Sequence, residues 1–153
     1  MQIFPVLSVK DSVVLPGSAL PLKIGRAQSI AAVEAAQKNG NLILTVSQKG
    51  EFDESKIDPE QLRLVGTLSQ IERVRGNAKE GYQIYLRGVS RFKVERFGER
   101  DGHIIAFGEE WKDTLDADPA TFHTMLDVLK NMSLKILDLL PNDTRHIADV
   151  VKD

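Results

Sequence analysis

The hydrophobic pattern of this 153-residue chain changes from mainly β-like to helical between Lys112 and Asp118. Before that point, apolar residues form short β-rich runs separated by glycine, proline and charged residues, a pattern typical of strands. After it, apolar positions recur every three or four residues from Phe122 to Leu140, which indicates one amphipathic helix. Because the two patterns pack differently, we expect a β-rich domain over residues 1–112 and the start of a helical subdomain over residues 118–153.

The β-rich part combines several predicted strands with one helix. Two apolar runs, Ile3 to Leu7 and Ser12 to Leu15, end near prolines, so we expect both at a sheet edge. Residues 28–39 carry apolar side chains at helical spacing and end at Gly40, which predicts a short helix. Further strands are expected over residues 41–48, 67–75, 82–88, 92–97 and 103–111. Together these elements favour an α+β fold, a curled sheet or small barrel of roughly five to seven strands with one embedded helix.

The segment after residue 118 has clear helix signals at both ends. Asp118 and Pro119 suit the N-cap and the first helical position, and Pro141 ends the pattern. The apolar stripe between them needs a covering partner. Residues 143–152 also show helical spacing, so we expect the chain to enter a helical bundle that it does not complete.

The sequence holds no recognisable catalytic or cofactor-binding pattern. It has no cysteine and no Gly-Lys pair of a phosphate-binding loop, and its serines lack a nucleophile motif. The histidines His103, His123 and His146 stand in separate segments without ligand spacing, so no metal or cofactor is expected. The longest apolar runs are too short to cross a membrane, and a chain without cysteine fits the cytoplasm. We therefore expect a non-enzymatic protein without a membrane partner.

One stretch is locally basic although the formal charge of the whole chain is −2. Its cations are Arg73, Arg75, Lys79, Arg87, Arg91, Lys93, Arg96 and Arg100, opposed by Glu72, Glu80, Glu95 and Glu99. Small barrels can bind RNA through such surfaces when aromatic side chains are at hand for stacking. However, Tyr82 alternates with Ile84 and Leu86 as a core face would. An RNA-binding barrel is the alternative function, and nucleic acid is not the expected partner.

The first part of the chain resembles a known family. The matching pieces keep their order and spacing from Phe4 to about Phe97 and are Pro5-Val-Leu, Lys10-Asp11, Val14-Leu-Pro-Gly17, Pro21-Leu22, Ile24-Gly-Arg26, Ser29, Val33-Glu-Ala35, Gln48-Lys49, Leu62, Val65-Gly-Thr67, Gly88 and Arg91. As a set they are similar to the N-terminal substrate-recognition domain of Lon, the ATP-dependent protease. The chain departs from the family pattern at Ser8, where proline is usual, and at Lys10, where arginine is usual.

The resemblance implies both a fold and a role. The fold would be a small six-stranded, PUA-like pseudo-barrel with one embedded helix, followed by the start of a helical bundle. The role would be to bind unfolded or damaged polypeptide clients in protein quality control and to deliver them to ATPase and Ser-Lys protease domains of the same parent chain. Weak self-association is expected at most, and a stand-alone adaptor remains the other alternative.

A recogniser of unfolded proteins needs exposed apolar surface that does not aggregate, and proline-interrupted edges provide it. We hypothesise a shallow client groove, which is lined by Leu15, Pro16, Leu20, Pro21, Leu22, Ile71 and Val74. The competing interpretation is that these side chains fill the barrel. We also expect Arg26 to anchor the first helix by bonding a carbonyl or carboxylate.

Overall fold

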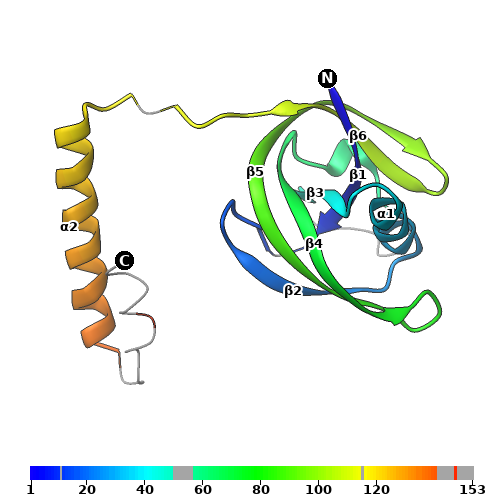
Figure 1. Cartoon of the computed structure of the whole chain (residues 1–153), viewed down its shortest axis with the longest axis horizontal. Helices are drawn as coiled ribbons and strands as arrows, with labels where there is room; N and C mark the ends of the chain where they lie inside the picture. Colours follow the sequence, from blue (N-terminus) through cyan, green and yellow to red (C-terminus); the bar gives the residue numbers. More distant parts are fainter. Residues whose placement is uncertain (11, 50–56, 115, 141–146, 148–153) are drawn as a thin grey trace. The chain divides into compact units, whose positions relative to one another are not determined.

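The computed structural model describes all residues except 11, 50–56, 115, 141–146 and 148–153. Within it the chain forms two compact units, Met1–Lys112 and Asp113–Asp153. The first unit is a curled sheet with one helix, and the second contains one long helix (Figure 1).

Six strands make up the sheet of the first unit. They are β1 Gln2–Val9, β2 Ala19–Ile24, β3 Leu42–Ser47, β4 Val65–Asn77, β5 Gly81–Arg100 and β6 His103–Glu110. Their order is β2-β5-β4-β3-β1-β6, and an additional pairing of β5 with β6 closes the sheet on itself. The β1–β3 pair is parallel and the others are antiparallel. The expected α+β pseudo-barrel of six strands is therefore confirmed.

The long strand β5 makes this closure possible. Its first half pairs with β2 and β4, and the part from Phe92 to Arg100 pairs with β6. Opposite β4 the register skips Val89, a bulge that bends a strand and increases its twist. The sequence pattern predicted two separate strands here because polar and glycine residues interrupt the apolar run around this bulge.

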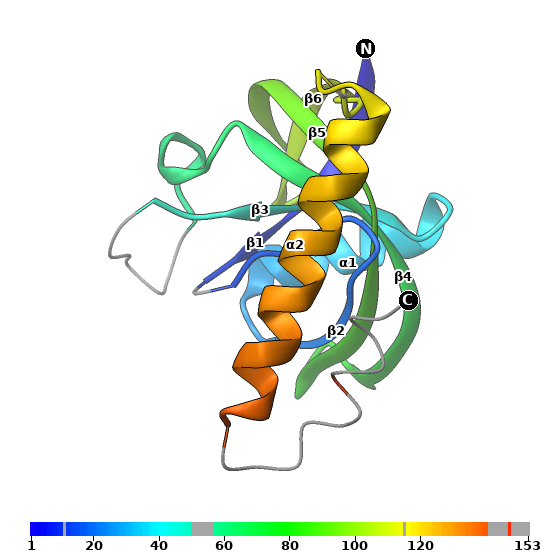
Figure 2. The ribbon, with the colours of Figure 1, turned by 90° about the vertical axis from the view of Figure 1, so that its left-hand side faces the viewer.

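Helix α1, Ala27–Lys38, contacts β1, β3 and β6 (Figure 1). Its buried residues Ala32, Val33 and Ala36 join one core cluster, whose other members are Leu7, Ile24, Ile43, Ile71, Ile84 and Leu86. A second cluster surrounds Phe92, whose ring meets Phe4 edge to face at 5.5 Å between centroids. The paired strands β1 and β3 are seen together in Figure 2. The predicted helix is confirmed to within one residue at each end.

Two sequence expectations about the amino-terminal part were wrong. Strand β1 is an interior strand between β3 and β6, and its pairing with β3 begins at Val6, directly after Pro5. The proline therefore stands outside that ladder. Residues 12–15 are not a strand, whereas Ala19–Ile24 is one despite Pro21. Strand β2 has only β5 as a neighbour in the described part of the chain, and an edge strand is where a proline is tolerated.

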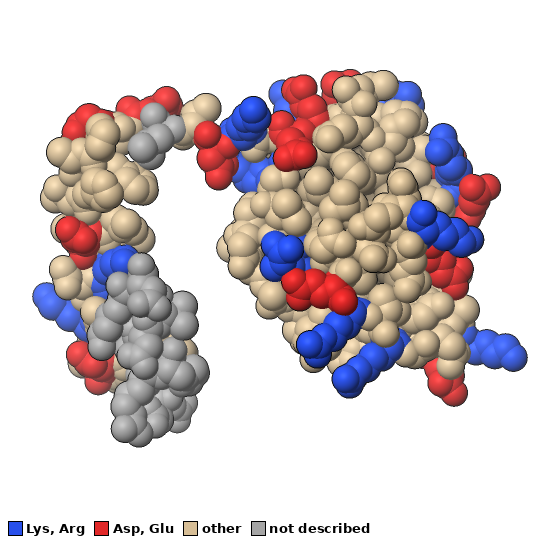
Figure 3. Space-filling view, viewed as in Figure 1, with Lys and Arg blue, Asp and Glu red and all other residues tan. Residues whose placement is uncertain are grey.

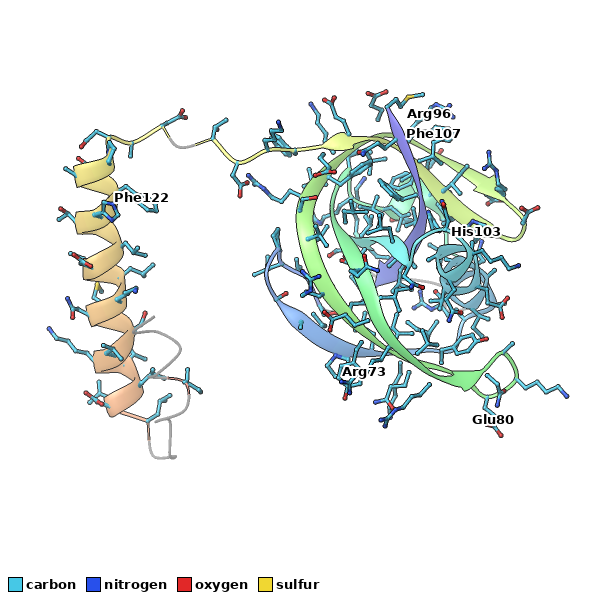
Figure 4. The ribbon with its side chains drawn as sticks, viewed as in Figure 1. Arg73, Glu80, Arg96, His103, Phe107 and Phe122 are labelled. Atoms are coloured by element: carbon cyan, nitrogen blue, oxygen red, sulfur yellow. The ribbon has the colours of Figure 1, made fainter. Side chains whose placement is uncertain are left out.

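A 3₁₀ helix over Pro59–Gln61 lies between β3 and β4, and the Asp58 carboxylate before it accepts a hydrogen bond from the Glu60 N–H at 2.9 Å. His103 is the first residue of β6, within the strand predicted over residues 103–111, and its side chain is buried (labelled in Figure 4).

The second unit contains helix α2, Pro119–Asp138. Asp118 caps it, since its carboxylate accepts from the N–H groups of Ala120 and Thr121, each at 3.1 Å, and from the Thr121 hydroxyl. These bonds, the one from the Thr121 hydroxyl first, lower the pKa of the Asp118 carboxyl. Several apolar side chains of this helix are exposed, including Met125 at 66% and Leu129 at 62%. The further helix predicted over residues 143–152 lies outside the described residues, apart from Ile147.

No helix in the described ranges is long and apolar enough to cross a membrane.

Candidate functional site

The loop between β1 and β2, here called the Val13–Ser18 loop, displays apolar side chains on a fixed backbone. Val14 is buried and its carbonyl accepts a hydrogen bond from the Thr67 hydroxyl at 2.6 Å. Because neighbouring residues of an extended chain point to opposite sides, burying Val14 turns Val13 and Leu15 outward. These two side chains are 64% and 60% exposed.

The far end of this loop is attached to β5 at Gly88. The Gly17 N–H donates to the Gly88 carbonyl at 3.0 Å, and the Gly88 N–H donates to the Ser18 carbonyl at 2.8 Å. The backbones lie so close that a Cβ at Gly88 would stand 2.2 Å from the Leu15 carbonyl oxygen. The Ser18 hydroxyl also donates to that oxygen at 2.7 Å and accepts from the Leu15 N–H at 3.1 Å. Hydrogen bonds within the protein therefore fix the loop backbone at both ends.

Beside the loop lies a hollow of about 190 Å³, here called the apolar groove. It is lined by Val9, Val13, Val14, Leu15, Pro16, Thr45, Ser47, Val65, Gly66, Thr67 and Arg91. Val65, at the start of β4, is 42% exposed and faces the groove with the loop residues. A Cβ at Gly66 would lie 2.5 Å from the Thr45 carbonyl oxygen, so the glycine lets β3 and β4 approach closely at this point. An apolar side chain of a ligand fits the composition and size of this hollow.

The structure brings only part of the predicted client site together. Leu15 and Pro16 are exposed and line the apolar groove. Pro21 is exposed on β2 but is not among the residues that line the groove. Val13 and Val65 belong to the groove and were missed, since the run around Val13 was interpreted as an edge strand.

The other four predicted residues lie on the inner face of the sheet. Leu20 stands opposite Leu86 and Leu22 opposite Ile84, both of which are fully buried. On the other side of β5, Ile71 and Val74 stand opposite the same two residues. Ile71 is a member of the core cluster and is only 3% exposed. Leu22 and Val74 are half-buried and pack against this cluster. For these positions the structure favours the competing interpretation, that the side chains fill the barrel.

Four of the eight cations of the basic stretch, Arg87, Arg91, Lys93 and Arg96, contact neighbouring side chains. Arg87 forms an ion pair with Glu72 at 2.8 Å, and the Arg96 guanidinium lies 3.5 Å from the centre of the Phe107 ring (Figure 4). On the face shown in Figure 3, acidic and basic side chains of the first unit are interspersed. The face shown there therefore lacks the one-signed field that favours nucleic acid.

The aromatic side chains of Tyr82 and Trp111 are engaged as well, whereas Tyr85 is 39% exposed. The Tyr82 hydroxyl donates to Glu34 of α1 at 3.1 Å, and burial followed by this bond raises the pKa of Tyr82. Trp111 is approached by Arg91 at 5.3 Å and Lys93 at 5.9 Å from its ring centre. These contacts tie the rings to the protein's own side chains. They do not leave a row of free rings for bases.

Comparison with solved structures identifies the fold. The fold is shared with the N-terminal domain of Mycobacterium avium complex Lon protease, with a TM-score of 0.77 and 22% identity over 99% of this chain and 75% of that one. A Lon N-terminal domain protein from Xanthomonas campestris gives a TM-score of 0.62 and 19% identity over 100% of this chain and 91% of that one. The fold is therefore that of Lon N-terminal domains.

The sequence comparisons define the family. The model of the ATP-dependent protease La (LON) substrate-binding domain matches residues 3–153. Lon protease 1 of Bdellovibrio bacteriovorus is 33% identical over 97% of this chain, and the Lon protease of Desulfovibrio desulfuricans is 35% identical over 88% of it. The chain belongs to the Lon substrate-binding domain family, a non-catalytic region of an ATP-dependent protease. It spans 19% and 15% of the length of these two relatives.

Proposed function

We propose that this domain binds unfolded or damaged polypeptides in the apolar groove and helps deliver them to the ATPase and protease domains of a Lon-type parent chain. The proposal rests on one observation: the side chains of Val13 and Leu15 are exposed, while the backbone of their loop is hydrogen-bonded to Thr67 and Gly88. A preformed apolar site binds without an ordering cost on its own side. Membership in the substrate-binding family supports the same role.

The groove suits ligands that share little sequence. Its lining is mostly aliphatic and its volume is about 190 Å³, enough for one or two apolar side chains and too small for a folded partner. Few anchored contacts give weak and broad binding, which a recogniser of many clients requires. The edge of β2 away from β5, which pairs with no other strand in the described part of the chain, offers main-chain groups to an extended client as well.

The remaining features of the proposal follow from the family role. The domain works in the cytoplasm, associates with itself weakly at most, and takes its clients as extended chains without hydrolysing them. An RNA-binding barrel and a stand-alone adaptor are the alternatives.

The test is binding of a permanently unfolded protein, reduced and carboxymethylated, measured by fluorescence anisotropy. Replacing Leu15 and Val65 by serine removes two exposed apolar side chains of the groove. We expect the double variant to bind about tenfold more weakly, because it loses the free energy that two aliphatic side chains contribute when the client partly buries them. Ile3→Ser is the matched control, because Ile3 is 41% exposed in the same unit but lies outside the groove. Equal affinity of the double variant and the parent would refute the groove as the client site.

A salt series separates the proposal from the RNA alternative. Apolar client binding persists or strengthens as ionic strength rises, whereas binding to phosphates weakens steeply. The same titration with a single-stranded RNA oligonucleotide as the probe completes the comparison.

A further inference from the structure

A second hollow of about 200 Å³, here called the basic pocket, lies beside the apolar groove. It is lined by Ser8, Val9, Lys10, Ser12, Leu22, Lys23, Ile24, Gly25, Arg26 and Ser29. The two hollows share Val9, and Ser12 of the pocket is followed in sequence by Val13 of the groove. Consecutive Cα atoms, such as those of Ser12 and Val13, are about 3.8 Å apart, so the two hollows adjoin each other. One bound polypeptide can therefore reach both.

The pocket gathers positive charge. Lys10, Lys23 and Arg26 line it, and none of the described residues that line it carries a carboxylate. Within the described part of the chain, none of the three cations forms an ion pair. The carbonyl or carboxylate partner expected for Arg26 is likewise not found there. Asp11, next in sequence to Lys10, is outside the described residues.

The amino-terminal end of α1 adds to this field. Arg26 occupies the N-cap position without a side-chain cap, and the first turn holds no acidic residue. The first intrahelical bond is donated by the Ile30 N–H, so the N–H groups ahead of it have no partner in the helix. The positive end of a helix dipole beside lysine and arginine is unfavourable unless an anion binds between them.

Two serine side chains of the pocket add hydroxyl groups that have no hydrogen-bond partner within the described residues. Ser29 is only 4% exposed and lines the pocket, and its hydroxyl makes no hydrogen bond in the described ranges. The Ser8 hydroxyl also lines the pocket, and its oxygen is buried without a partner. A buried hydroxyl such as that of Ser8 is normally hydrogen-bonded, and the hydroxyls of Ser8 and Ser29 can both donate to an anion.

We propose that the basic pocket binds a carboxylate of the same polypeptide whose apolar side chain occupies the groove. The inference rests on the proposed function and narrows its substrate class to segments with a carboxylate within a few residues of an apolar side chain. Polypeptides carry this group in Asp and Glu side chains and at the free carboxyl terminus. The pocket supplies cations, helix N–H groups and two hydroxyls as donors to it.

The experiment uses the full 153-residue chain and three fluorescent peptides that share one flexible, leucine-containing sequence. The first has an internal Glu and an amidated end, the second has Gln and a free carboxyl end, and the third has Gln and an amidated end. We expect the first, the second or both to bind roughly three- to tenfold more tightly than the third at low salt. The peptide that gains affinity identifies the source of the carboxylate.

Two charge variants decide whether the pocket is responsible. Lys23→Gln with Arg26→Gln removes two pocket cations, of which Lys23 is exposed and Arg26 half-buried, and we expect the preference for carboxylate to disappear. Affinity for the third peptide should change less than twofold. Arg100→Gln with Lys112→Gln is the control, since it removes the same charge from exposed positions outside both hollows.

Each outcome decides the matter. Equal binding of all three peptides to the parent overturns this inference and leaves the proposed function standing. A preference that disappears equally in the control variant shows a general charge effect and also overturns the inference. Binding of none of the peptides refutes the proposed function, and this inference with it.

Discussion

Replacing Gly88 by alanine tests how the Val13–Ser18 loop is held in place. The added Cβ would lie 2.2 Å from the Leu15 carbonyl oxygen, 2.9 Å from its carbonyl carbon and 3.2 Å from the Pro16 Cα. All three are backbone atoms, so no side chain can rotate away and the loop itself has to move. The move breaks the bonds from Gly17 N–H to the Gly88 carbonyl and from Gly88 N–H to the Ser18 carbonyl.

The expected magnitude comes from two opposing effects. Gly88 has no positive φ, so alanine can adopt its backbone conformation and gains about 0.4–1 kcal/mol by restricting the unfolded chain. Overpacking costs about 1–3 kcal/mol, and each lost hydrogen bond costs about 1 kcal/mol. We therefore expect Gly88→Ala to lower the free energy of unfolding by about 2–5 kcal/mol, and client affinity to fall with it.

Urea denaturation followed by circular dichroism measures this change. Gly25→Ala is the matched control, because Gly25 also lacks a positive φ but has no atom within 4 Å of the added Cβ. The control should be as stable as the parent or slightly more stable. If Gly88→Ala behaves like Gly25→Ala, the close approach of loop and strand described here is wrong.

Three further changes test other parts of the account. Ile71→Ala removes a buried side chain and should cost about 2–5 kcal/mol in urea denaturation, while the client affinity of the folded fraction, measured by anisotropy, stays unchanged. Thr67→Val leaves the buried Val14 carbonyl without its donor and should cost about 1–3 kcal/mol and weaken client binding in the same two assays. Because the Thr121 bond lowers the Asp118 pKa, its contribution to α2 is complete above the unfolded value of about 3.9 and is lost as the pH falls through the lower folded value. Circular dichroism at 222 nm should show this loss of helix, and Asp118→Asn should reduce its pH dependence.

The sequence predicted those elements whose local signals agree with the final packing. Helix α2 begins after Asp118 as its cap predicts, and the helix expected over residues 28–39 is α1. Strand β2 was missed because Pro21 argues against a strand, and only the tertiary structure shows that this strand lies at an edge. The two strands predicted over residues 82–88 and 92–97 are one strand, β5, which continues through a bulge at Val89. The hydrophobic periodicity does not predict such a bulge.

The candidate site was less predictable than the fold. Apolar side chains in a short β-rich run look alike whether they face the core or solvent, and the face is set by the pairing partner. Leu22 and Val74 were assigned to the groove, but their register opposite Ile84 places them against the core. The exposure of Leu15 follows from hydrogen bonds to residues more than 50 positions away, such as the one between Thr67 and Val14.

The most direct test of client binding in the apolar groove is an NMR titration. The ¹⁵N-labelled 153-residue chain is titrated with a permanently unfolded protein, and amide shift changes are mapped onto the structure. We expect the largest changes in the Val13–Ser18 loop and in Val65–Thr67. Changes confined to α2, whose Met125 and Leu129 are as exposed as Leu15, would contradict this account.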